Sequence, residues 1–349
     1  MELATIIHQY RGNLEQHYGD RLLPGHRYAL DAMLRCRTPQ SGQVHWACHH
    51  CNQHQYQPLS CGHRSCPRCQ NLEATRWLDR QRAKLLPVDY FMATFTLPAQ
   101  LRALAWRHQT VVYGLLFDCA VSTLRDFGLN PEKLGAELGM TAVLHTHARD
   151  KSFHPHVHII VPGGGIHRLR RCWKKVKGRY LFNAFALAKV FRARMLDGLN
   201  NAGVPIPNPV PEQWVADCCR VGHGGPALEY LSRYLYRGVI AECDIIANQN
   251  GKVTFRYVES GTGDTRTRTL PGADFLWLIL QHVLPRGFRR VRDYGFLHGN
   301  AKKLLGLVQL ILHVTLAFPV ASKRPKPACP ECGNPMHAAS IIRGHWHPG

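Results

Sequence analysis

The sequence lacks a long apolar run and a secretion signal. Its most membrane-like stretch, residues 304–320, is barely long enough to span a bilayer and contains Gln309, His313 and Pro319, so we expect a buried helix there. Residues 1–4 carry neither a basic start nor an apolar core. We therefore expect a protein that is not exported, has no membrane partner and works in the cytoplasm.

Acidic residues are also scarce. The chain has 23 Asp and Glu against 44 Lys and Arg, which gives a formal net charge of +21 and indicates a polyanionic partner. Charge alone does not separate DNA from RNA or from an anionic membrane. Hydrophobic residues make up 45% of the 349 residues, which excludes disorder and predicts two or three domains with a real core.

The cysteines do not suit a disulfide framework, because there are 13 of them and several form close pairs. This pattern is typical of thiolates that hold a metal in a reducing compartment. Two Cys-x-x-Cys knuckles, each able to offer two sulfurs, predict one closed structural Zn²⁺ site. Cys61 or His63, which lie between the knuckles, could replace one ligand. The four expected ligands are Cys48, Cys51, Cys66 and Cys69.

Basic residues around the second knuckle, including Arg64 and Arg68, suggest a zinc-stapled head that binds DNA. A purely structural ribbon with a solvated basic face is the alternative. The tail carries half of another knuckle, Cys329 and Cys332, and a histidine could complete a second zinc site there. An unmetallated tail remains the alternative. The candidate histidines are His337, His345 and His347.

A row of histidines marks the centre of the chain. Residues 153–162 are rich in β-branched side chains and end at a Pro-Gly pair, which predicts a short buried strand. Because side chains alternate along a strand, His154, His156 and His158 should project to the same face. They are either core histidines or a metal platform, and the regular spacing favours metal.

The preceding residues 141–147 predict a second strand, joined to the first by a polar hairpin loop. If the hairpin is symmetric, His145 lies opposite His156, and His147 opposite His154. Directly paired residues share a face. His145 is therefore the candidate third ligand, although a register slip of one residue would remove it.

A helix is expected over residues 227–237, where Tyr230 and Tyr234 share one face and Arg233 and Arg237 another. Tyrosines at this spacing usually serve packing. Beside a metal site and an arginine pair suited to phosphate, they suit nucleophilic attack instead. A phenol with a pKa near 10 needs a strongly polarised target. A divalent ion on the histidines could polarise a phosphodiester, which would leave a 5′-phosphotyrosine.

Residues 168–180 interleave basic side chains with Trp173 and Tyr180, which suits single-stranded nucleic acid. A solvated charged loop is the alternative. Lys174 and Lys175 are the DNA-binding candidates in this segment.

His156, Val157 and His158 resemble the His-hydrophobic-His (HUH) motif of rolling-circle endonucleases. The wider pattern resembles the two-tyrosine transposases of the insertion-sequence-ninety-one family, and the likeness covers roughly residues 45 to 305, including the zinc module. Its segments are residues 144–146, 154–158 with the following glycines, 230–234, 251–257 and 281–292.

The resemblance implies an α+β fold, an antiparallel sheet with helices (HUH endonuclease-like), plus a small N-terminal zinc ribbon. It also implies a bacterial transposase that nicks single-stranded DNA at element ends and moves the strand by a rolling-circle route. His156 and His158 match the family's metal pair, which implies Mg²⁺ or Mn²⁺, while the zinc is structural. Tyr230 and Tyr234 match its nucleophiles. The third metal ligand is not fixed by the resemblance.

We expect three domains: a helical and zinc-binding DNA-recognition domain at 1–86, a catalytic domain at 87–322 and a basic tail at 323–349. Residues 87–98 should form a core strand and residues 101–125 a helix. A metallohydrolase is disfavoured, because no Asp-His pair follows the histidines. A replication initiator or relaxase, and a non-catalytic zinc-ribbon DNA-binding protein, remain open.

Overall fold

The computed structural model describes the whole chain except residues 70, 179, 236–238, 260–261, 316–325 and 345–349. Inside helices, the side chains of residues 71–72, 230 and 232–235 also lie outside the description. The chain forms two compact units. Unit 1 comprises Met1–Arg76, Tyr236–Val283 and Val320–Gly349, and unit 2 comprises Trp77–Leu235 and Leu284–Pro319. The sequence prediction, with boundaries at 86 and 322, places residues 236–283 in the catalytic domain, whereas in the structure they belong to unit 1. As boundaries of functional domains, 86 and 322 stay a prediction.

Unit 2 is built on a five-stranded sheet in the order β12-β4-β5-β3-β8, with all neighbours antiparallel. The expected strands over 87–98, 141–147 and 153–162 are confirmed as β3, β4 and β5. The histidine strand β5 lies at the centre, where its β-branched residues are buried on both faces. The strands are β3 (Asp89–Thr96), β4 (Gly139–His147), β5 (Phe153–Pro162), β8 (Ala216–His223) and β12 (Val291–Gly295).

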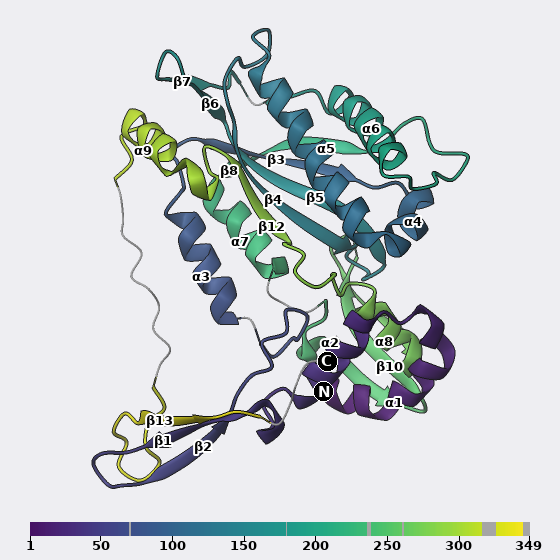
Figure 1. Ribbon diagram of the computed structural model, residues 1–349, viewed down its shortest axis with the longest axis vertical. Coiled ribbons are helices and arrows are strands. Elements are labelled where there is room, and N and C mark those ends of the chain that lie inside the picture. Colours follow the sequence, from purple (N-terminus) through teal and green to yellow (C-terminus); the bar gives the residue numbers. More distant parts are fainter. Residues whose placement is uncertain (70, 179, 236–238, 260–261, 316–325, 345–349) are drawn as a thin grey trace. The chain divides into compact units, whose positions relative to one another are not determined.

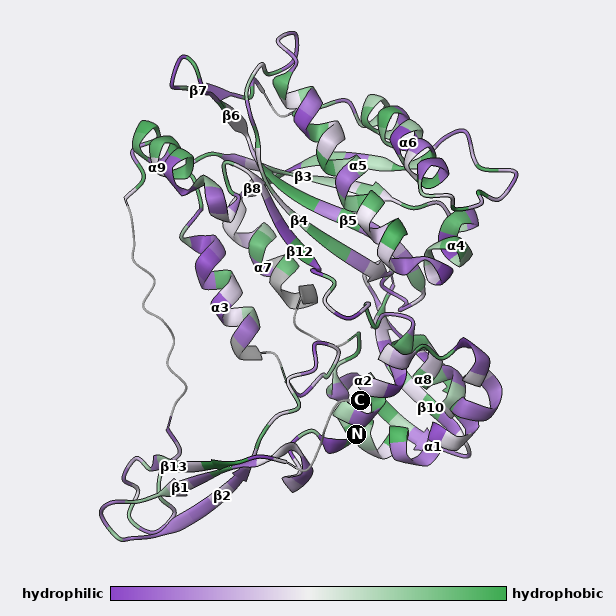
Figure 2. Cartoon of the chain, viewed as in Figure 1, coloured by the Kyte–Doolittle hydropathy of each residue, from purple (hydrophilic) through white to green (hydrophobic). Residues whose placement is uncertain are grey.

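One face of this sheet forms the main apolar core. Alternate residues of β3 and β5, such as Phe95 and Val157, are fully buried there against the helices that cover this face. Figure 2 shows the hydrophobic colouring of β4, β5 and α5. The helix expected over 101–125 is divided in two at His108, whose φ of −122° and ψ of 44° are not helical. The covering helices are α4 (Arg102–Arg107), α5 (Gln109–Leu129) and α6 (Ala184–Asn201).

The opposite face carries the histidines and is covered by helix α7 (Gly224–Leu235). The predicted helix over 227–237 is confirmed for residues 227–235, and residues 236–237 lie outside the described part. α7 contacts β3, β4, β5 and β8, and its first residue, Gly224, lies so close to Tyr90 that an added Cβ would be 2.9 Å from the ring. Tyr90 alternates with the core residue Phe91 along β3, so it lies on the histidine face. Figure 1 shows α7 on the other side of the sheet from α5.

The remaining elements of unit 2 lie around this framework. The prediction of a buried helix over 304–320 is wrong, because α9 ends at Ile311 and Leu310 is 73% exposed. Residues 316–320 lie outside the described part. Among the described helices, none is both long and apolar enough to cross a membrane. The remaining elements of unit 2 are the hairpin of β6 (Gly164–His167) and β7 (Cys172–Lys175), helix α3 (Asn71–Arg82), which starts in unit 1, and helix α9 (Lys302–Ile311).

Unit 1 packs its first helix against a helix from the middle of the chain. Tyr18 of α1 stacks on Trp277 of α8 at a ring-centroid distance of 4.8 Å, and Gly272 leaves room for the ring of Tyr10. Two antiparallel three-stranded sheets, β11-β10-β9 and β13-β1-β2, complete the unit. The α+β prediction is therefore confirmed. The helices are α1 (Leu3–Tyr18), α2 (Pro24–Arg35) and α8 (Gly272–Leu280). The strands are β1 (Gln43–Ala47), β2 (His54–Pro58), β9 (Ile245–Gln249), β10 (Lys252–Val258), β11 (Thr265–Pro271) and β13 (His337–Ile342).

Candidate active site and cysteine clusters

Three histidines converge on the sheet face under α7. The register pairs His145 of β4 directly with His156 of β5, as the hairpin argument predicts. The ligand nitrogens of His145, His156 and His158 all lie within 4.8 Å of one another, and all three residues are buried. The ring centroid of His145 is 5.1 Å from that of His156 and 4.4 Å from that of His158.

The surroundings hold these rings in the form that binds a metal. Burial lowers the pKa of His156 to about 4 and that of His158 to about 3, and it lowers the pKa of His145 well below its ordinary value. All three are therefore neutral at pH 7. Nδ1–H of His156 donates to the carbonyl oxygen of His154 at 2.7 Å, which directs the other nitrogen, Nε2, toward the group. Three neutral imidazoles fit a divalent ion, although as a donor set they suit Zn²⁺ and other transition metals better than Mg²⁺.

His154, the first histidine of the row on β5, does not belong to this group. Its Nδ1 accepts a hydrogen bond from Nη2 of Arg102 at 2.5 Å. The prediction that His147 lies opposite His154 is wrong, because a bulge between His145 and His147 pairs His147 with Phe153. The extra residue on β5 makes this part of the hairpin asymmetric.

The tyrosines stand on the helix that covers the histidine face. Positions 230 and 234 lie one turn apart on α7, which contacts the histidine strands β4 and β5. The side chains of Tyr230, Arg233 and Tyr234, and the whole of Arg237, lie outside the described residues. Their roles stay predictions.

The first cysteine cluster combines one expected knuckle with two other cysteines. Sγ of Cys69 is 3.2 Å from Sγ of Cys36 and 3.5 Å from Sγ of Cys61, and Cys66 completes the group. Four sulfurs around a tetrahedral zinc ion, with Zn–S bonds of about 2.3 Å, lie about 3.8 Å apart. The cluster therefore suits zinc. Cys61 was among the sequence candidates, whereas Cys36 was missed, because a single cysteine next to a helix end has no motif.

The other expected knuckle lies in a second cluster. Cys48 and Cys51 meet Cys329 and Cys332 of the tail. The prediction that Cys48, Cys51, Cys66 and Cys69 share one ion is therefore wrong in its grouping. Cys48 and Cys51 lie at the turn between β1 and β2, and the five residues of β2 span about 16 Å before the chain reaches Cys66. The strand thus carries the second knuckle away from the first.

His337, one of the expected tail histidines, is not a member of this cluster. His337 pairs with Ala47 in the sheet, and its ring lies 4.6 Å from that of His49. His345 and His347 lie outside the described residues.

We expect Cys36→Ser to remove one zinc ion per chain and to lower the melting temperature, because Cys36 supplies a sulfur that closes the first cluster. Metal analysis of the purified protein measures the loss, and thermal unfolding measures the stability. Cys172→Ser is the matched control, since Cys172 belongs to neither cluster. An unchanged zinc content in Cys36→Ser would contradict this assignment.

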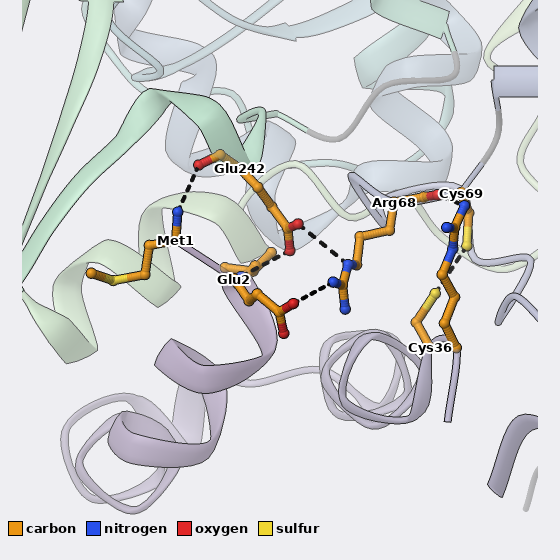
Figure 3. Close-up of polar contacts among 8 residues, drawn as sticks. Met1, Glu2, Cys36, Arg68, Cys69 and Glu242 are labelled. Carbon is orange, nitrogen blue, oxygen red and sulfur yellow. Dashed lines mark hydrogen bonds and ion pairs between the residues drawn. The ribbon is translucent and has the colours of Figure 1, made fainter. Parts of the chain in front are cut away.

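The basic residues proposed to bind DNA have several different surroundings. Arg68 lies between two carboxylates of unit 1, at 2.6 Å from Glu2 and 3.3 Å from Glu242 (Figure 3). It therefore ties segments of unit 1 together, whatever it contributes to DNA binding. Arg64 is partly buried, which lowers the pKa of its guanidinium.

In the β6-β7 hairpin, Lys175 is exposed and Lys174 is half-buried. Trp173, one of the two rings interleaved with the basic residues of this segment, packs edge-on against Phe296, with ring centroids 5.8 Å apart. Arg168 pairs with Glu137. DNA binding by the two lysines stays a prediction.

Comparisons with known proteins define the class of this protein. Residues 6–97 match the family described as "Transposase zinc-binding domain", and residues 139–304 match the family described as "Putative transposase". The first region contains the cysteines of the first cluster, and the second contains the three histidines and α7. The protein is a transposase, an enzyme class that binds DNA and cuts and joins its strands.

Similar proteins narrow the class to a family. The chain is 33% identical over 351 residues to "Putative transposase y4qJ" of Sinorhizobium fredii (strain NBRC 101917 / NGR234), covering 93% of this chain and 87% of that protein. It is 27% identical over 319 residues to "Transposase for insertion sequence element IS801" of Pseudomonas savastanoi pv. phaseolicola, covering 84% and 74%. The chain belongs to the IS91 family of transposases, as the sequence resemblance predicts. No solved structure matches it.

Proposed function

We propose that this transposase nicks single-stranded DNA at the ends of its element through a 5′-phosphotyrosine on Tyr230 or Tyr234. The strand is then transferred by a rolling-circle route. The observation that carries the proposal is the convergence of three buried, neutral imidazoles on the sheet face that α7 covers. A zinc-ribbon protein that only binds DNA would have no use for this group, and the family membership favours a transposase over a replication initiator or relaxase.

His145, His156 and His158 would hold a divalent ion, for which the family resemblance favours Mg²⁺ or Mn²⁺. When bound, such an ion neutralises a non-bridging phosphate oxygen and polarises the phosphorus. The hydrogen bond from His156 to the His154 carbonyl keeps the His156 ring oriented. Arg233 and Arg237 are proposed to hold the DNA backbone near the helix.

The chemical step exchanges one phosphodiester for another. The hydroxyl oxygen of one tyrosine attacks the phosphorus, the bond from phosphorus to the 3′ oxygen breaks, and the phenol proton ends on that 3′ oxygen. The step therefore needs no ATP. The second tyrosine, one helical turn away, accepts the second strand. Cleavage and rejoining then alternate between the two tyrosines.

The first cysteine cluster is proposed to bind a structural zinc ion. Its four sulfurs join the end of α2 to the loop that follows β2. A closed set of four thiolates leaves no position for a substrate, so its role is to hold this part of unit 1 together.

The test uses labelled single strands copied from both ends of the element that encodes the protein. With Mg²⁺ or Mn²⁺ we expect a protein–DNA adduct that survives denaturing electrophoresis, and we expect none with the same sequence as a duplex. Omitting the divalent ion after dialysis should prevent adduct formation while the structural zinc is retained. An adduct that forms on duplex DNA alone, or without any divalent ion, would contradict the proposal.

A further inference from the structure

The two knuckles of the second cysteine cluster have the same backbone geometry, although they lie at opposite ends of the sequence. The amide of Cys48 donates to the carbonyl oxygen of Gln53 at 2.9 Å, and the amide of Cys329 donates to that of Asn334 at 2.8 Å. The separation is five residues in both. Each knuckle therefore turns back on itself in the same way.

The residue after each knuckle also matches. Asn52, after Cys51, has φ of 55°, and Gly333, after Cys332, has φ of 69°. Both are in the left-handed region, which Asn and Gly adopt most readily. This shared turn points both sulfurs of each knuckle to the same side, as a zinc knuckle requires.

The sulfurs of the two knuckles face one another. Sγ of Cys48 is 3.5 Å from Sγ of Cys332, and Sγ of Cys51 is 3.4 Å from Sγ of Cys329. These distances are too long for disulfides, whose S–S bond is about 2.0 Å. They are close to the separation of about 3.8 Å expected around a tetrahedral zinc ion.

The sheet that carries this cluster has a very small apolar core. The buried cluster consists of Cys48, Cys329 and Met336, with Trp46 and Cys332 partly packed against it. β13 is exposed over its whole length, and β2 nearly so. A module of this size buries too little apolar surface to be held by packing alone, and such modules usually depend on a metal or a disulfide.

We propose that a zinc ion held by Cys48, Cys51, Cys329 and Cys332 fastens the C-terminal segment onto the N-terminal hairpin. We call this site the zinc clasp. The tail contributes strand β13, which joins the sheet by pairing with β1 and places His337 opposite Ala47. Figure 1 shows β13 alongside β1 and β2. One zinc ribbon is thus assembled from the two ends of the chain. The inference is independent of the proposed DNA chemistry.

Zinc counting on the full-length protein tests whether the four cysteines share one ion. We expect the variant Cys48→Ser/Cys51→Ser and the variant Cys329→Ser/Cys332→Ser each to contain one zinc ion fewer than the parent. All four changes together should still remove only one. Cys243→Ser, at an exposed cysteine outside both clusters, should remove none. An unchanged zinc content in the tail variant, or a loss of two ions in the fourfold variant, would overturn the proposal.

A second measurement needs no cysteine substitution. A specific protease site is inserted between residues 319 and 326 of the full chain, and the cleaved protein is passed over a sizing column. With zinc bound, we expect the tail fragment to elute with the main body; after treatment with a zinc chelator, it should elute separately. A tail that separates while zinc remains bound, or that stays attached after all zinc is removed, would refute the clasp.

Discussion

Replacing both Tyr230 and Tyr234 with Phe is expected to abolish the denaturant-resistant DNA adduct, with a loss of roughly 10⁴-fold or more in its rate of formation. The substitution removes the hydroxyl oxygen that is proposed to attack phosphorus and keeps the aromatic ring. Binding of single-stranded DNA should therefore remain. Quantitative denaturing gels measure the adduct, and fluorescence anisotropy measures binding.

The control for this pair is Tyr56→Phe, which removes the hydroxyl of an exposed tyrosine on β2, outside α7. It should leave the adduct unchanged. The single variants Tyr230→Phe and Tyr234→Phe then show which tyrosine attacks first. If the double variant still forms the adduct, the nucleophile lies elsewhere and the proposed chemistry is wrong.

His158→Ala is expected to slow adduct formation about a thousandfold. A metal ion supplies several kcal/mol of transition-state stabilisation, and a loss of about 4 kcal/mol corresponds to this factor. His158 is one of the three converging imidazoles, so its removal should also raise the Mn²⁺ concentration needed for half-maximal activity. Rates measured across a Mn²⁺ titration give both quantities.

The matched control is His154→Ala, a change two residues earlier on the same strand. His154 bonds to Arg102 and lies outside the three-histidine group. The carbonyl that accepts from His156 belongs to the backbone, so it survives the substitution. Equal losses in His154→Ala and His158→Ala would show that the effect comes from disturbing the strand and not from losing a ligand.

The histidine hairpin could be predicted from the sequence because its signals are local. Alternating apolar residues fix which side chains share a face, and a short polar loop brings His145 opposite His156. The bulge that pairs His147 with Phe153 could not be foreseen, since it depends on how neighbouring strands constrain the hairpin. The end of α9 at Ile311 was also missed, because apolar composition alone does not decide where a helix stops.

The cysteine clusters show the limit of spacing arguments. Each knuckle is recognisable by itself, but nothing in its sequence says which other knuckle it meets. Cys51 and Cys329 are separated by 278 positions, and only the pairing of β1 with β13 brings them together. Cys36 carries no motif, so its place in the first cluster depends on the packing of α2.

The discontinuity of unit 1 affects how a nascent chain matures. The apolar side of α1, with Leu3, Ile6 and Ile7, is synthesised long before its partner α8, which ends at residue 280. Until then α1 has α2 as a neighbour but lacks α8, while the unit 2 strands β3, β4, β5 and β8 are already complete by residue 223. Four of the five strands of the unit 2 sheet are thus synthesised before unit 1 can finish its core, and early chaperone binding at α1 is the expected consequence.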